Sequence, residues 1–177
     1  PAEWALTLAV GLIWGSAFLW IALGVDHLAP GVVAFGRVVL GALALAVFPR
    51  ARRVIHSSDW LRLVAVAVFG NAAPPLLFAV AETELDSAVA GMITSGTPLL
   101  SLLIASLMMR SRPPRTQAIG IGLGFVGIIM MTVPSLRGAE AAPLGVALVL
   151  IATVGYGLNG NLLVPLQQRY GGPAVTL

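Results

Sequence analysis

The sequence predicts an all-α, polytopic membrane helical bundle, and three observations lead to this fold class. Hydrophobic residues make up 58% of the chain and charged residues only 10%, whereas soluble domains usually carry about 25% charged residues. Successive apolar runs approach the roughly 20 residues that cross a bilayer. The links between them are short and polar. Because unpaired backbone groups are costly in lipid, these runs are expected to be helices.

About six membrane spans are predicted, with ends defined to within a few residues. They cover residues 4–23, 30–49, 60–80, 88–109, 116–133 and 144–164. The first span is interpreted as a retained helix rather than a signal peptide. No positive charge precedes it, and it is longer than the apolar core of a signal peptide, which has about 7 to 15 residues.

The basic residues orient the bundle. All ten are arginines. Most flank the second link, fill the fourth link or follow span six: Arg50, Arg52, Arg53, Arg62, Arg110, Arg112, Arg115 and Arg169. Only Arg137 lies on the other side, where Glu82, Glu84 and Asp86 gather. The positive-inside rule therefore predicts a cytoplasmic N-terminus. Because the arginines are spread over separate links, the pI of about 10.6 is not taken to indicate a nucleic-acid partner.

An internal repeat relates the first span to the sixth. When the chain is shifted by 142 positions, Trp14-Gly15 falls on Tyr156-Gly157, and after one inserted residue Pro30 falls on Pro173. An odd number of helices separates the copies, so the second copy would cross the membrane in the opposite direction. Inverted repeats are common in secondary transporters, whose substrate sites lie near the midplane.

Several motifs, taken in order, resemble the EamA-like half of the drug/metabolite transporter superfamily. They are WGSAF at 14–18, PGVVAFGR at 30–37, TPLLSLLIA around Pro98 and the Gly-rich fifth span. The resemblance implies ten helices in two inverted five-helix repeats. Residues 1–134 would form the first repeat, and residues 135–177 would be the loop and first helix of a truncated second one. It also implies a transporter of small metabolites, often an exporter.

The chain departs from the family pattern at two places. Residues 109–114 lack the acid that commonly closes span four, which puts an inner-gate ion pair using that acid in doubt. The sequence also ends where span seven of the family pattern should begin. The resemblance therefore implies that the sequence is truncated or a fragment.

Arg37 is the charged residue inside a span. It lies about 10 Å along the helix from Pro30, at a depth where charge needs a partner or an aqueous cavity. Three interpretations stay open. Arg37 snorkels to the outer surface, pairs with Glu82 or Glu84, or binds a substrate carboxylate or phosphate.

Prolines predict helix kinks or breaks in spans three and four. Pro74 and Pro75 leave the carbonyls of Gly70 and Asn71 without donors, and Pro98 does the same for Thr94. These carbonyls, with the neighbouring hydroxyls, either line a polar pathway or are satisfied again by Ser and Thr side chains.

Span six carries two asparagines about 200° apart around the helix. Asn159 shares a face with Tyr156 and is predicted to face the pathway, while Asn161 is predicted to hydrogen-bond a neighbouring helix. The alternative is that both amides only hold helices together. Trp14 is predicted to floor a substrate cavity or to pack in the core. The complete predicted pathway is Trp14, Ser16, Arg37, Asn71, Thr94, Ser95, Tyr156 and Asn159.

The motifs argue against an enzyme, a cofactor or a metal site. The G-x-G-x-x-G at 122–127 lies inside an apolar span, whereas a dinucleotide site needs a preceding strand. No P-loop and no H-E-x-x-H zinc motif occurs, and the chain has no Cys.

The function predicted is that of a multi-pass inner-membrane secondary transporter, an exporter by resemblance, for a small polar or amphipathic metabolite. The alternative is a non-transporting helical scaffold or assembly subunit. The bilayer and a metabolite are the expected partners, and a homodimer is left open. The sequence names neither the substrate nor the coupling ion.

Overall fold

The computed structural model describes residues 2–138 and 143–176, and every element within them is helical. In chain order the α-helices are α1 (Ala2–Val25), α2 (Pro30–Ala46), α3 (Trp60–Val66), α4 (Ala73–Ala81), α5 (Ser87–Thr94), α6 (Thr97–Met108), α7 (Arg115–Gly138), α8 (Pro143–Tyr170) and α9 (Gly172–Thr176). By length and composition, five segments of the described chain can cross a membrane: Glu3–Val25, Ser57–Ala81, Ser87–Met108, Arg115–Val133 and Pro143–Tyr170. The chain is therefore an all-α polytopic membrane protein.

Helix α2 is the exception among the predicted spans. It has 17 residues and is about 25 Å long at 1.5 Å per residue, which is at the short limit for crossing a hydrocarbon core of about 30 Å. The helix ends at Ala46, and Pro49 opens a separate 3-10 turn, η1 (Pro49–Arg52). The helix thus ends a few residues before the predicted end at residue 49, within the range allowed for the span ends.

Span three stays helical through its two prolines. A π-helical turn, η3 (Ala67–Ala72), joins α3 directly to α4, and Pro74 and Pro75 lie in the first turn of α4. The amide of Ala73 donates to the carbonyl of Val68. A wider turn of this kind pairs each amide with a more distant carbonyl, so the chain passes the prolines without a non-helical residue. The prolines widen the helix and do not break it.

Span four is interrupted at the residues between α5 and α6. Helix α5 ends at Thr94, α6 begins at Thr97, and Pro98 lies in the first turn of α6. Proline is well accommodated at that position because it has no amide to pair. The Thr97 hydroxyl donates to the carbonyl of Thr94 at 2.7 Å. The carbonyl that Pro98 leaves without its usual donor is therefore satisfied by a side chain.

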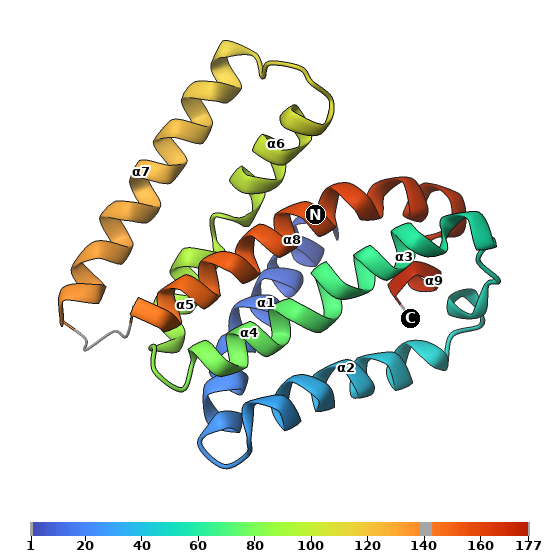
Figure 1. The fold of residues 1–177 in the computed structure, drawn as a ribbon, viewed down its shortest axis with the longest axis horizontal. Coiled ribbons are helices and arrows are strands. Elements are labelled where there is room, and N and C mark those ends of the chain that lie inside the picture. The colour runs from blue at the N-terminus through green and yellow to red at the C-terminus, as the bar shows by residue number, and fades with distance from the viewer. Residues whose placement is uncertain (1, 139–142, 177) are drawn as a thin grey trace.

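Helix α8 lies between the other spans, with α3 and α4 on one side and α5 and α6 on the other (Figure 1). Its glycines allow this close packing. A Cβ added at Gly155 would lie 3.3 Å from the Phe69 carbonyl, and one at Gly157 would lie 3.2 Å from the Ser101 amide. Helix α8 also extends past the predicted end at residue 164, although Pro165 lies within it.

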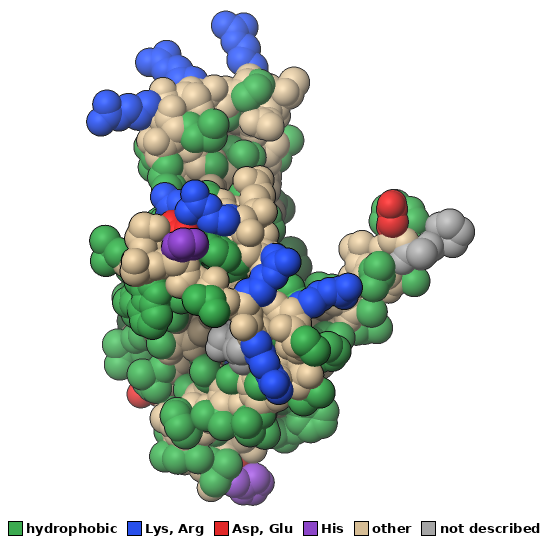
Figure 2. All heavy atoms as spheres, turned by 90° about the vertical axis from the view of Figure 1, so that its right-hand side faces the viewer, with side chains coloured by type: hydrophobic (Ala, Val, Ile, Leu, Met, Phe, Trp, Pro, Cys, Tyr) green, Lys and Arg blue, Asp and Glu red, His purple; other side chains and the backbone are tan. Residues whose placement is uncertain are grey.

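Two apolar clusters lie at different levels of the bundle. The larger contains Ile21, Phe78, Ala79, Val89, Ala90 and Val149, with small residues where helices approach. The smaller contains Val66, Leu166, Tyr170, Ala174 and Val175. Many large apolar side chains remain exposed, among them Trp4, Leu12 and Leu123. Figure 2 shows such side chains over much of one face. An apolar exterior of this extent suits a lipid environment.

Candidate functional site

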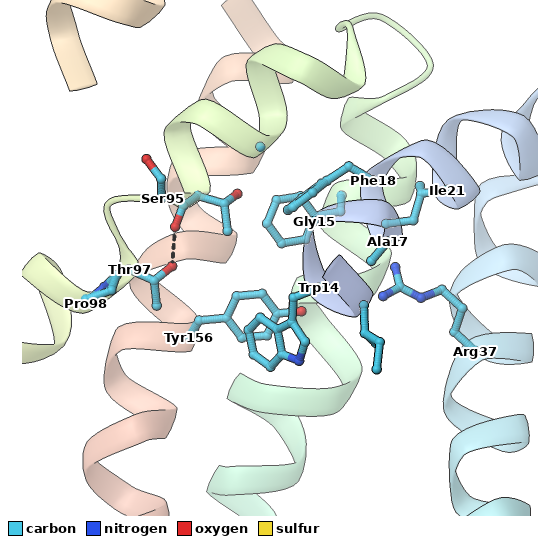
Figure 3. Close-up of a pocket in the computed structure, with 14 residues that line it drawn as sticks. Trp14, Gly15, Ala17, Phe18, Ile21, Arg37, Ser95, Thr97, Pro98 and Tyr156 are labelled. Carbon is cyan, nitrogen blue, oxygen red and sulfur yellow. Dashed lines mark hydrogen bonds between the residues drawn. The ribbon is translucent and has the colours of Figure 1, made fainter. Parts of the chain in front are cut away.

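A cavity of about 580 Å³ opens between α1, α2, α4, α5, α6 and α8 (Figure 3). Its volume falls within the range of about 300 to 1,000 Å³ that is usual for small-molecule sites. Five residues of the predicted pathway contribute to its lining: Trp14, Arg37, Thr94, Ser95 and Tyr156. Because these residues come from α1, α2, α5, α8 and the interruption between α5 and α6, the fold gathers side chains that are far apart in the sequence.

Aromatic rings form one wall of the cavity. The rings of Trp14 and Tyr156 have centroids 6.3 Å apart. Tyr156 stacks on Phe78 at 5.8 Å, and Phe78 meets Phe18 edge to face at 5.3 Å. The sequence comparison of span one with span six predicts Trp14 and Tyr156 to be equivalent positions, and both residues lie at this cavity. Such a wall suits an apolar group of a ligand.

Arg37 contributes the positive charge of the cavity. Its side chain is exposed and lines the cavity from α2. Within residues 2–138 and 143–176 the ion pair that forms joins Arg169 to Asp59, so Arg37 does not pair directly with Glu82 or Glu84. Of the three interpretations open from the sequence, the structure contradicts only the ion pair with Glu82 or Glu84.

The hydroxyl groups of the cavity offer oxygen acceptors. Thr94 donates its proton to the Ala90 carbonyl, Ser95 to the Met92 carbonyl and Thr97 to the Thr94 carbonyl, at 2.6 to 2.7 Å. A hydroxyl that donates its one proton keeps its lone pairs available. In Figure 3 Ser95 and Thr97 lie on the opposite side of the view from Arg37. The cavity thus has acceptors at one end and a cationic donor at the other.

Three residues of the predicted pathway do not line this cavity. The Ser16 hydroxyl donates to the Ile13 carbonyl within α1. Asn71 is half-buried on the π-helical turn. Asn159 packs against Gly70, where an added Cβ would lie 2.5 Å from its Nδ2 atom. Tyr156 and Asn159 therefore do not both face the cavity as predicted. Tyr156 lines the cavity, whereas Asn159 packs against η3.

Asn161 makes the predicted contact with a neighbouring helix. Its Nδ2 atom donates to the Ser101 carbonyl at 2.8 Å and lies 3.2 Å from the Ser101 hydroxyl oxygen, both on α6. It also donates to the Gly157 carbonyl one turn earlier in α8, at 2.9 Å. This amide therefore ties α8 to α6 beside the close approach at Gly157.

Sequence reasoning missed several residues of the cavity. Phe18 and Phe78 form much of the aromatic wall, and Thr97 adds a hydroxyl. Phe18 belongs to the WGSAF motif and Thr97 begins the TPLLSLLIA motif, so both lay within recognised signals. Phe78 looks like any other apolar residue of its span, and only the packing of α4 against α1 and α8 reveals it.

A polar cluster joins the second link to the end of α8, away from the cavity. Oδ2 of Asp59 accepts hydrogen bonds from Arg169 Nη1 at 2.6 Å and from the Tyr170 hydroxyl at 2.7 Å. Arg53 donates to the Tyr170 carbonyl at 3.3 Å. An ion pair therefore forms at the Arg-rich end although residues 109–114 lack an acid, because Asp59 supplies the carboxylate.

No metal-binding group of three or more His, Asp or Glu side chains is found where the chain is described. The groups that line the cavity include Arg37, hydroxyl groups and aromatic rings.

Comparison with known proteins agrees with this architecture. A profile of the EamA-like transporter family matches residues 3–133. An uncharacterized transporter of Archaeoglobus fulgidus is 25% identical over 95% of this chain and 59% of its own length. A probable amino-acid metabolite efflux pump of Salmonella typhimurium is 26% identical over 96% of the chain and 56% of its own. A probable terminal-alkyne amino-acid exporter of Streptantibioticus cattleyicolor is also 26% identical, over 97% and 57%.

The chain thus spans little more than half the length of these curated relatives. No solved structure matches it.

Proposed function

Because the chain belongs to the EamA-like transporter family, we propose that it forms the substrate-binding part of an exporter of small amino-acid-like metabolites. The cavity beside Trp14 and Tyr156 would hold the substrate. The observation that carries this proposal is an arginine without an acidic partner in the same cavity as an aromatic wall. The presence of a cavity also favours a transporter over the scaffold alternative, for which polar residues would only hold helices together.

Each part of the cavity matches one part of an amino acid. The guanidinium of Arg37 suits a carboxylate, which it can bind through two parallel hydrogen bonds. The hydroxyl oxygens of Thr94, Ser95 and Thr97 can accept hydrogen bonds from an ammonium group. The aromatic wall suits an apolar side chain. The names of two relatives, an amino-acid metabolite efflux pump and an amino-acid exporter, support the same substrate class.

The proposal includes the cell (inner) membrane as location, with the N-terminus and the Arg-rich links in the cytoplasm. The bias of arginines toward one set of links supports this orientation. Residues 1–134 would be the first five-helix repeat and α8 would begin the second. The meeting of Trp14 and Tyr156 at one cavity supports that division, because substrate sites of such transporters lie where the repeats meet.

The test compares ligands that differ only in the carboxylate. Binding of 3-phenylpropanoate and of its neutral amide would be measured on the purified protein expressed from its complete gene, as quenching of tryptophan fluorescence. We expect Arg37→Gln to weaken binding of the carboxylate by about tenfold or more and to leave binding of the amide unchanged. Arg112→Gln, in an exposed link, is the matched control. Equal losses for both ligands would mean that Arg37 does not recognise the carboxylate.

A further inference from the structure

Glu82 is a buried carboxylate that the proposed site does not use. It follows the last residue of α4, and only 8% of its surface is exposed. Neither carboxylate oxygen accepts a hydrogen bond from the described part of the chain. A carboxylate in such a place is costly in its ionised form, since both its hydration and its partners are missing. A role in fold stability does not account for it.

Among the groups around Glu82, Arg37 provides the charge that acts on its carboxylate. The backbone of Ala22 on α1 lies beside it, and the guanidinium of Arg37 on α2 exerts an attraction from beyond ion-pair distance. The nearby acids Asp26, Glu84 and Asp86 are all exposed. Helix α8 faces this link with Gly145, and Arg169, the charged residue of α8, is near its other end. Arg37 also acts on Tyr156, the titratable group of the cavity wall.

The protonation of Glu82 responds to this environment. Burial raises the pKa of its carboxyl to about 8, while the positive charge of Arg37 acts in the opposite direction. The protonated form therefore predominates at neutral pH. The ionised form becomes populated as the pH rises through that value.

We infer that Glu82 is a proton-dependent competitor for Arg37, so that a substrate carboxylate binds in the cavity when Glu82 is protonated and is disfavoured when Glu82 is ionised. Ionised Glu82 opposes part of the positive field of Arg37 at the cavity. Protonated Glu82 leaves that field to the substrate. The inference rests on the proposed function, because it assumes that Arg37 binds the carboxylate.

Thermodynamic linkage gives the reverse effect. If the proton strengthens binding of the carboxylate, the bound carboxylate must strengthen binding of the proton by the same factor. Substrate binding near pH 8 should then draw a proton from solution onto Glu82. Glu82 is a positioning residue in this scheme, since it acts through Arg37 and does not touch the substrate.

The experiment follows the dissociation constant of 3-phenylpropanoate from pH 6 to pH 9 on the protein expressed from its complete gene. This probe has no amino group that titrates in the range. We expect binding to the wild type to weaken by about fivefold or more, the lower end of usual coupling between sites. Glu82→Gln should bind at every pH as the wild type does at pH 6. Glu84→Gln, an exposed acid in the same link, should keep the wild-type profile.

A second measurement follows proton uptake on ligand binding. Addition of 3-phenylpropanoate to the wild type in weak buffer at pH 8 should take up protons, and the uptake should disappear in Glu82→Gln. A pH profile that persists in Glu82→Gln, or binding without proton uptake, would overturn the inference while the carboxylate preference at Arg37 stands. Loss of that preference itself would instead remove the proposed function.

Discussion

The cluster at Asp59 permits a comparison between a charged partner and a neutral one. Arg169 and the Tyr170 hydroxyl donate to the same carboxylate oxygen, at 2.6 and 2.7 Å. We expect Tyr170→Phe to lower the free energy of unfolding more than Arg169→Gln does, although the arginine carries a full charge and the hydroxyl carries none. The reason is the difference in burial between the two side chains.

The structure sets the expected magnitudes. The Arg169 side chain is 63% exposed, and exposed ion pairs contribute about 0 to 1 kcal/mol. Tyr170 is only 7% exposed, and hydrogen bonds to charged groups contribute about 1.5 to 3 kcal/mol. Phenylalanine keeps the ring that packs against Val66 and Leu166, so the loss comes from the hydroxyl alone. The tyrosine variant should therefore be the less stable by at least about 0.5 kcal/mol.

Equilibrium unfolding in mixed micelles of dodecyl maltoside and SDS, followed by tryptophan fluorescence, gives the free energies. Asp59→Asn removes the shared acceptor charge and should cost at least as much as Tyr170→Phe. Arg112→Gln, an exposed arginine outside the cluster, is the control and should be neutral. An Arg169→Gln loss equal to or larger than the Tyr170→Phe loss would refute the reasoning, because charge would then outweigh burial at this site.

Two further predictions concern helix packing and orientation. Asn161→Ala removes the hydrogen bond to the Ser101 carbonyl that joins α8 to α6, and it should cost about 0.6 kcal/mol in the same assay, the usual value for an interhelical bond. Asn159→Ala, whose Oδ1 atom is buried without a partner, should cost less, and the opposite order would contradict the packing argument. Since the chain has no Cys, single cysteines report topology. At Ser57 or Ser111 they should react with an impermeant maleimide only from the cytoplasmic side, and at Thr83 only from outside; the reverse pattern would invert the orientation.

The spans were predictable because their signal is local. Composition and run length locate the helices, and Pro98 marks the interruption between α5 and α6. The comparison of span one with span six also aligned Trp14 with Tyr156, and these two residues lie together at the cavity. The ends were less predictable. Helix α8 continues beyond Pro165, where Tyr170 and Arg169 find partners on Asp59 that lies far away in the sequence.

The functions of individual polar residues depend on packing that no local pattern contains. Asn71 and Asn159 look like pathway residues in sequence, but Asn71 lies on η3, Asn159 packs against Gly70 of η3, and neither lines the cavity. Glu82 looks like one more acid of a polar link, yet the approach of α1, α2 and α8 buries it. The sequence shows which polar residues lie in apolar spans, whereas the packing of the helices determines what each of these residues contacts.

The position of α8 has a mechanical consequence. If α8 begins the second repeat, the first helix of that repeat packs between helices of the first repeat. Gly155 and Gly157 let α8 approach the backbone on both sides. If the two repeats moved as separate rigid bodies, the close contacts of Gly155 and Gly157 with the neighbouring backbone would be lost. The bending needed to expose the cavity first to one side and then to the other would fall within the helices. Spans three and four, which pack against α8, each contain an irregular segment: the wide turn η3 and the interruption at Ser95 and Gly96. These two segments would act as hinges beside α8.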